Sequence, residues 1–302
     1  MKTFLLFLSL IFLLSACTQK ATTDTLATSC PPDCSGGDTG VVTTIHAPQD
    51  EGTVYVGDRL APSVTLDDLG ESSVEGGLVC ITGLDGAIFS GLGGCNCQSF
   101  YTTIDDPHDA NFEQATVNFQ GSLLTAEGVG NQHLTFYTRY SYSAYGPFTL
   151  CLTGDPYHET DCLVEGNKLT SSSSGPLHIR SLTESISTQG SNSVNLRLKI
   201  DVDTPSSDTG RLLSVEQTSD SRCVLPPSDT VSADVSVILF GESYDCGKIT
   251  FSSAEESASV SCKLDAIDTQ NFIGGQKDYE GWVRIDYGYQ ELQSVAFTVS
   301  GT

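Results

Sequence analysis

The sequence predicts an all-β protein made of two antiparallel β-sandwich domains, and three observations support this class. Short apolar runs alternate with polar residues at a period of two, as in half-buried strands. Clusters of Gly, Pro, Asp and Ser separate these runs. The composition, with 29 Gly, one Met and one Trp in 302 residues, is typical of strands and turns rather than of packed helices.

The predicted strands fall into two series. The first contains residues 41–45, 53–56, 63–66, 78–82, 87–90, 100–103, 115–119, 133–142 and 148–153. The second contains residues 177–187, 193–202, 211–218, 231–240, 248–251, 258–264, 282–289 and 293–299. We therefore expect one sandwich domain at 41–156, a linker at 157–175 that includes a run of serines, and a second sandwich domain at 176–302. In arrangement and size each half resembles an immunoglobulin-like or fibronectin-like sandwich.

The N-terminus begins like a signal peptide. Lys2 precedes an apolar run from Phe4 to Leu14, which as a helix of eleven residues spans only about 16 Å, too short for a bilayer core of about 30 Å. The next residues, Leu14-Ser15-Ala16-Cys17, resemble the lipobox of prokaryotic lipoproteins. This resemblance implies that residues 1–16 are removed, that Cys17 carries lipid, and that the membrane is a partner. It places the protein at the cell membrane or outer membrane, lipid-anchored, on the exported side.

The cysteine count agrees with this reading. Removing Cys17 from the eleven cysteines leaves ten, an even number that an oxidising compartment can pair. The candidates for disulfides are Cys30, Cys34, Cys80, Cys95, Cys97, Cys151, Cys162, Cys223, Cys246 and Cys262. Their spacings lack the paired C-x-x-C of a structural zinc site, so we expect no metal and no cofactor.

Two pairings follow from position in the chain. Residues 248–251 and 258–261 flank a polar turn, and folding them as a hairpin brings Cys246 opposite Cys262. Cys162–Cys223 is then the simplest remaining pair in the second domain. The connectivity of Cys80, Cys95, Cys97 and Cys151 stays open, and a Cys30–Cys34 pair would close a small loop in the flexible tether expected at residues 17–40.

Charge and motifs narrow the function. The chain has 14 Lys+Arg against 38 Asp+Glu, a net charge of −24, which argues against nucleic acid as a partner. Nucleophile-elbow, zincin and phosphate-loop motifs are missing, so we expect no enzyme. The acidic residues Asp105, Asp106, Asp109, Asp201 and Asp203 fit a solvated surface, with calcium binding as the alternative.

The expected role is display, adhesion or ligand binding at the cell envelope, with a protein or glycan ligand. A carbohydrate-binding module or a polysaccharide-acting enzyme is the alternative, and a structural spacer is the third interpretation. Along residues 133–145, Phe136, Tyr140 and Tyr142 share one face of the strand. Tyr137, Arg139 and Tyr145 share the other and are the candidate ligand-binding residues.

Replacing Cys17 by serine tests the lipid anchor. We expect Cys17→Ser to move the protein from the membrane to the soluble fraction, because the acyl chains that hold it there can no longer be attached. Mass spectrometry of the mature N-terminus checks this directly. A wild-type protein without acyl groups, or a variant that still partitions with membranes, would contradict it.

Overall fold

The computed structural model describes residues 40–47, 52–74, 76–89, 91–102, 113–125, 127, 129–152, 166–188, 193–203, 210–252, 257–268 and 277–301. The fold is all β, as predicted, and it is built around one large sheet. In order across that sheet lie β14 (Glu242–Ser252), β13 (Thr230–Leu239), β16 (Lys277–Ser300), β9 (Gly130–Leu152), β5 (Gly77–Thr82) and β6 (Asn96–Phe100).

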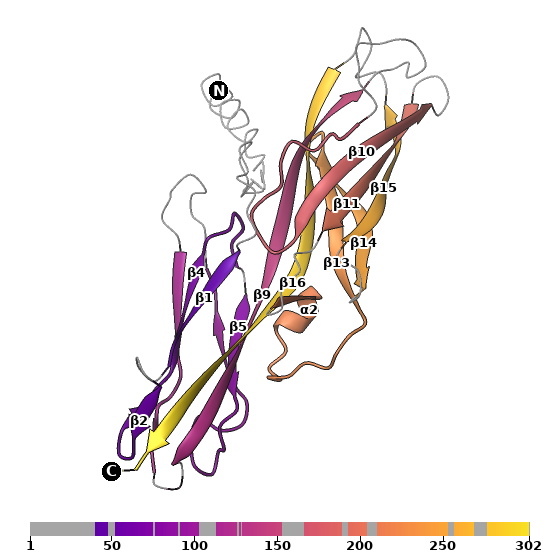
Figure 1. Ribbon diagram of the computed structural model, residues 1–302. Helices are drawn as coiled ribbons and strands as arrows, with labels where there is room; N and C mark the ends of the chain where they lie inside the picture. Colours follow the sequence, from indigo (N-terminus) through magenta and orange to yellow (C-terminus); the bar gives the residue numbers. More distant parts are fainter. Residues whose placement is uncertain are drawn as a thin grey trace, which may run out of the picture.

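Two smaller sheets cover the large one at opposite ends of the molecule (Figure 1). The first contains β1 (Val41–His46), β4 (Ser63–Asp68) and β7 (Glu113–Asn118). The second contains β10 (His178–Thr188), β11 (Ser193–Asp203) and β15 (Ser257–Asp268). β3 (Arg59–Leu60) and β8 (Ser122–Leu123) form a separate two-stranded sheet.

Strands β9 and β16 run the length of the molecule side by side (Figure 1). They pair antiparallel from Lys277↔Leu152 to Val299↔Gly130 without a register shift. At about 3.3 Å per residue, the 23 residues of β9 extend over about 75 Å. Along its other edge β16 pairs in turn with β13, with β12 (Gly210–Leu213) and, in parallel, with β2 (Thr53–Tyr55).

The expected breaks in these two strands do not occur. Gly146-Pro147 reads as the end of a strand, because proline lacks a backbone N–H. In the structure Pro147 lies opposite Trp282, and its carbonyl accepts a hydrogen bond from Thr170 on the other edge. Residues 133–142 and 148–152 therefore belong to one strand, and so do residues 282–289 and 293–299.

The period-two pattern identifies the core correctly. Leu196, Leu198, Ile200 and Val202 of β11 are fully buried, while Arg197 and Lys199 face solvent. One continuous core fills the space between the large sheet and both cover sheets. The strand predicted at residues 87–90 is wrong for residues 87–89, which form a turn, because the Asp85 carbonyl accepts from the backbone N–H groups of Ile88 and Phe89. Of the strand predicted at residues 100–103, only Phe100 is in a strand among the described residues.

The Cys246–Cys262 disulfide is present as predicted, but the hairpin that led to it is not. Cys246 lies on β14, which pairs with β13 in the large sheet, and Cys262 lies on β15, which pairs with β11 in the cover sheet. The bond therefore joins the two layers of the sandwich, with Cα atoms 4.6 Å apart. The apolar faces of both strands point to the same core, and this brings the two cysteines together.

Several expectations fall outside the described residues. They concern the signal peptide, Cys17, most of the tether, Cys30, Cys34 and Cys162, and Asp105, Asp106 and Asp109. The division into domains at 157–175 stays a prediction; segments before and after it pair within the large sheet. Among the described residues, no helix is long and apolar enough to cross a membrane.

The first described residue, Gly40, lies near the middle of the two long strands. A Cβ on Gly40 would lie 3.1 Å from Cδ of Pro176 and 3.5 Å from the hydroxyl of Tyr140. Tyr140 and Tyr142 of β9 lie opposite Tyr289 and Tyr287 of β16, at the centre of the ladder. We call this region, where the four tyrosines lie between the two cover sheets, the waist.

A buried ion pair joins the second cover sheet to Lys168. The side chain of Glu184 on β10 is fully buried, and its Oε1 lies 3.3 Å from Nζ of Lys168. Burial raises the pKa of Glu184 to about 7, although the Lys168 charge opposes the shift.

Replacing Glu184 by glutamine tests this coupling. Between the ordinary glutamate pKa and about 7, the folded protein binds a proton that the unfolded chain does not. The free energy of unfolding should therefore fall as pH rises through this window, and Glu184→Gln should remove that part of the pH dependence. Denaturant titrations from pH 4.5 to 8 measure it, with exposed Glu280→Gln as the control. Parallel pH profiles for the wild type and Glu184→Gln would contradict the assignment.

Candidate functional site

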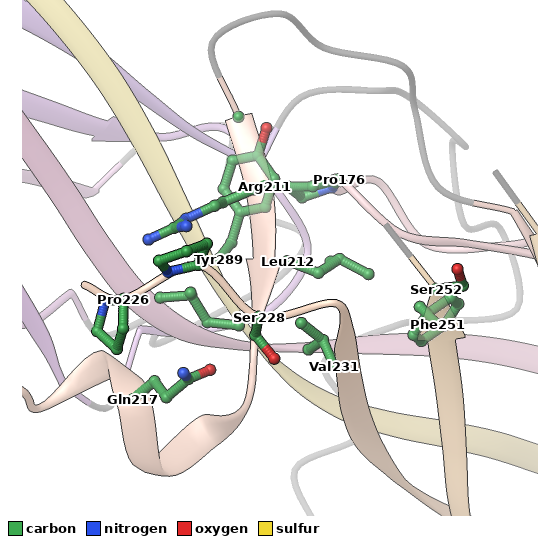
Figure 2. Close-up of a pocket in the computed structure, with 13 residues that line it drawn as sticks. Pro176, Arg211, Leu212, Gln217, Pro226, Ser228, Val231, Phe251, Ser252 and Tyr289 are labelled. Atoms are coloured by element: carbon green, nitrogen blue, oxygen red, sulfur yellow. The ribbon is translucent and has the colours of Figure 1, made fainter. Parts of the chain in front are cut away.

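A pocket of about 310 Å³ opens at the waist and is the best-formed candidate ligand site in the described part of the chain (Figure 2). Arg211 and Tyr289 lie on one side of it, and Phe251 and Ser252 lie on the opposite side (Figure 2). The described residues that line it are Pro176, Gly210, Arg211, Leu212, Leu213, Gln217, Pro226, Pro227, Ser228, Val231, Phe251, Ser252 and Tyr289.

The wall of the pocket is held by close backbone packing against β16. A Cβ on Gly210 would fall 1.6 Å from the Tyr289 hydroxyl, so only glycine allows that ring to lie beside β12. A Cβ on Gly288 would fall 2.6 Å from Cγ2 of Thr218, so glycine is also needed where α2 (Val215–Thr218) lies on β16. Two glycines thus allow β12 and α2 to form one side of the pocket.

The short helix replaces the end of a predicted strand. Residues 211–218 are expected to be one strand, but the strand ends at Leu213. The Gln217 side chain then accepts a hydrogen bond from the Ser214 backbone N–H at 3.0 Å. This contact satisfies an N–H at the start of the helix, as in a capping box. The turn directs the chain across the face of β9 and β16.

Arg139 fastens the segment that follows, residues 219–223, to the large sheet. Its Nε donates to Oε1 of Gln290 at 2.8 Å, and its Nη1 donates to the carbonyls of Asp220 and Arg222, each at 2.7 Å. Its Nη2 donates to the carbonyl of Cys223. Arg139 is fully buried, and burial lowers its pKa; the Asp220 charge opposes this, and the Arg211 charge adds to it.

Arg211 brings a second guanidinium to the same amide. Its Nη2 lies 3.5 Å from Oε1 of Gln290, the oxygen that already accepts from Arg139. Its Nε is buried and has no hydrogen-bond partner among the described residues. Two positive charges therefore share one neutral acceptor, and Arg211, the one of the two arginines that lines the pocket, keeps donor capacity for a further acceptor.

The sequence-predicted ligand residues do not form this site. Tyr137 and Tyr145 are half-buried, and each contacts a guanidinium: Arg139 lies 5.7 Å from the Tyr137 ring centre, and Arg284 lies 5.9 Å from that of Tyr145. Arg139 does not fit the ligand contact predicted for it, because residues 219–223, which we call the covering segment, lie over it and four acceptors occupy its donors. A ligand role for Tyr137 and Tyr145 stays a prediction.

The covering segment was missed because its disulfide was assigned wrongly. Cys223 pairs with Cys95, at the start of β6, and not with Cys162. This bond draws residues 219–223 over the face of β9 that the period-two pattern leaves open. Cys80 pairs with Cys97 directly across β5 and β6, and Cys151 is also disulfide-bonded.

Comparison with known proteins finds no family model and no curated protein that matches this chain. The site is therefore interpreted from its own geometry.

Replacing Arg139 by leucine should destabilise the fold strongly. It removes the donor from the Cys223 carbonyl, from the partly buried carbonyls of Asp220 and Arg222, and from the Gln290 amide, at about 1–3 kcal/mol for each buried group left unsatisfied. We expect a loss of about 3 kcal/mol or more in the free energy of unfolding, measured by denaturant titration. Arg197→Leu on the exposed face of β11 is the matched control and should change it by about 0.5 kcal/mol or less. Equal losses in the two variants would contradict this role for Arg139.

Proposed function

We propose that this chain is a lipid-anchored, non-catalytic cell-envelope protein that binds a ligand bearing a carboxylate or another anionic group in the waist pocket. The observation that carries the proposal is Arg211, which lines the open cavity and whose Nε is buried without a hydrogen-bond partner among the described residues. Its Nη2 lies 3.5 Å from the Gln290 oxygen that already accepts from Arg139. The anchor rests on the lipobox-like residues at Leu14–Cys17.

The lining supports binding rather than catalysis. The described residues offer an arginine, a glutamine, two serines and a tyrosine, set among proline and aliphatic side chains. A glycosidase requires two carboxyl groups facing each other about 5–10 Å apart. The described lining residues contribute no carboxylate, histidine or cysteine, so none of them can supply that pair.

The charge distribution supports an anionic ligand at this point of the surface. The chain as a whole carries a net charge of −24, which repels anions, so an anionic ligand needs a local site of opposite sign. Arg211 supplies that sign. Tyr289 and Phe251 add apolar surface of the kind on which a sugar ring or an aromatic side chain can pack. A uronic-acid glycan or a carboxylate-bearing peptide has this combination of groups.

The long strands support a display role. Because β9 and β16 pass through both ends of the molecule without a break, the pocket is held on a rigid frame. Binding residues placed on a rigid scaffold need little ordering when the ligand arrives.

The soluble Cys17→Ser chain tests the proposal. It is applied to glycan and peptide arrays, and dissociation constants are then measured for the probes that bind. We expect carboxylate-bearing probes to bind, with affinity that falls as salt rises. Arg211→Gln should weaken binding roughly tenfold or more, because a charge-assisted hydrogen bond contributes about 1.5–3 kcal/mol.

Arg197→Gln is the matched control, because Arg197 is an exposed arginine on β11 that does not line the pocket, and it should bind like the wild type. Equal binding by the Arg211→Gln and wild-type chains would contradict the pocket assignment. Turnover of a polysaccharide by the purified chain would overturn the non-catalytic role.

A further inference from the structure

Four cysteine sulfurs meet at one end of the large sheet, and they belong to two separate disulfides. Cys80–Cys97 joins β5 to β6, and Cys95–Cys223 joins the start of β6 to the covering segment. The sulfurs of Cys80, Cys97 and Cys223 lie within 4.8 Å of one another. The sulfurs of Cys95 and Cys97 lie 3.8 Å apart, close to van der Waals contact. All four are oxidised, so none of them is a thiolate that could hold a metal.

Each of these disulfides has one accessible and one buried sulfur-bearing residue. Cys95 is exposed and Cys97 is partly exposed, whereas Cys80 and Cys223 are buried. The accessible pair lies at the edge of the large sheet, since β6 is the last strand in its order. Cys246–Cys262 also pairs a partly exposed residue, Cys246, with a buried one, Cys262, but it joins different strands, β14 and β15.

The backbone around Cys95 permits a change of partner. Cys95 precedes β6, so it takes no part in the β5–β6 ladder, which extends from Gly77↔Phe100 to Ile81↔Asn96. The Ser221 carbonyl oxygen lies 3.3 Å from the Cys95 sulfur and 3.1 Å from the Cys97 sulfur, so both sulfurs contact the covering segment.

We propose that these four cysteines form a thiol–disulfide exchange site whose substrate is an exported dithiol. A thiolate of the dithiol attacks Sγ of Cys95, the Cys95–Cys223 bond breaks, and the electron pair leaves on Cys223. The second thiolate of the dithiol then attacks its own sulfur in the mixed disulfide. This releases Cys95 as a thiolate and the dithiol as a cyclic disulfide, and Cys223 takes up a proton.

The released Cys95 thiolate has a second disulfide within reach. It attacks Sγ of Cys97, 3.8 Å away in the oxidised protein, and the electron pair of the Cys80–Cys97 bond leaves on Cys80, which is protonated. The dithiol has lost two electrons and two protons, and the protein has gained them. The product contains a Cys95–Cys97 disulfide and free thiols at Cys80 and Cys223. The covering segment then loses its disulfide to Cys95 and keeps its hydrogen bonds to Arg139.

Partial reduction followed by mass mapping tests the site. The soluble Cys17→Ser chain is incubated with dithiothreitol at graded ratios of reduced to oxidised reagent, quenched with acid, and alkylated. In the species reduced by two electrons we expect alkylated Cys80 and Cys223 together with a Cys95–Cys97 linkage. Cys246–Cys262 should remain closed and should open at least tenfold more slowly.

Two variants separate exchange from simple reduction. Cys80→Ser/Cys97→Ser removes the second disulfide, so reduction should end with free Cys95 and Cys223. Cys246→Ser/Cys262→Ser removes the disulfide between the layers and should leave the exchange unchanged. A two-electron product of the Cys17→Ser chain with free Cys95 and Cys223, or one in which Cys246–Cys262 opens first, would overturn the proposal. That measurement needs neither variant to fold.

Discussion

One antiparallel pairing, between β9 and β16, sets the rest of the architecture. A shift of one residue would turn every side chain to the opposite face of the sheet, so burial at either end fixes the register along the whole ladder. β13, β12 and β2 pair in turn with one edge of β16, and β5 pairs with the other edge of β9. The four tyrosines of the waist lie where the ladder is half complete. Their ring centres are 5.7–6.2 Å apart between neighbours, so the four rings pack against one another.

The sequence allowed the local elements to be predicted better than their partners. Alternation along residues 193–202 identifies a strand and its buried face, because burial of one side is a property of the strand itself. Alternation contains no information about which strand lies beside it. The Cys246–Cys262 pair was therefore predicted for the wrong reason, since adjacent strands in the chain join different layers. The break predicted between residues 142 and 148 was wrong because β9 continues through Pro147, whose carbonyl finds its partner, Thr170, only in the folded chain.

The pocket could not be predicted for a related reason. Arg139 lies among aromatic residues on a face that the period-two pattern leaves open, so it was expected to contact a ligand. The segment that covers it is brought there by Cys95–Cys223, a bond across 128 positions of the chain that no spacing rule indicates. Arg211 and Tyr289 come together only because β12 pairs with the middle of β16. Gly210 and the Pro226-Pro227 dipeptide are sequence signals for close packing and a turn, but they do not indicate which segments lie next to them.

The position of Gly40 beside Pro176 and Tyr140 has a mechanical consequence. A force applied to the chain before Gly40 acts near the middle of the long β9–β16 ladder and not at one of its ends. Load is first taken up where the carbonyl of Gly40 accepts from Leu69 and where Val41 lies opposite Asp68. A force along β1 loads its pairing with β4 in shear over the whole strand. A force across β1 instead separates the two strands one residue pair at a time.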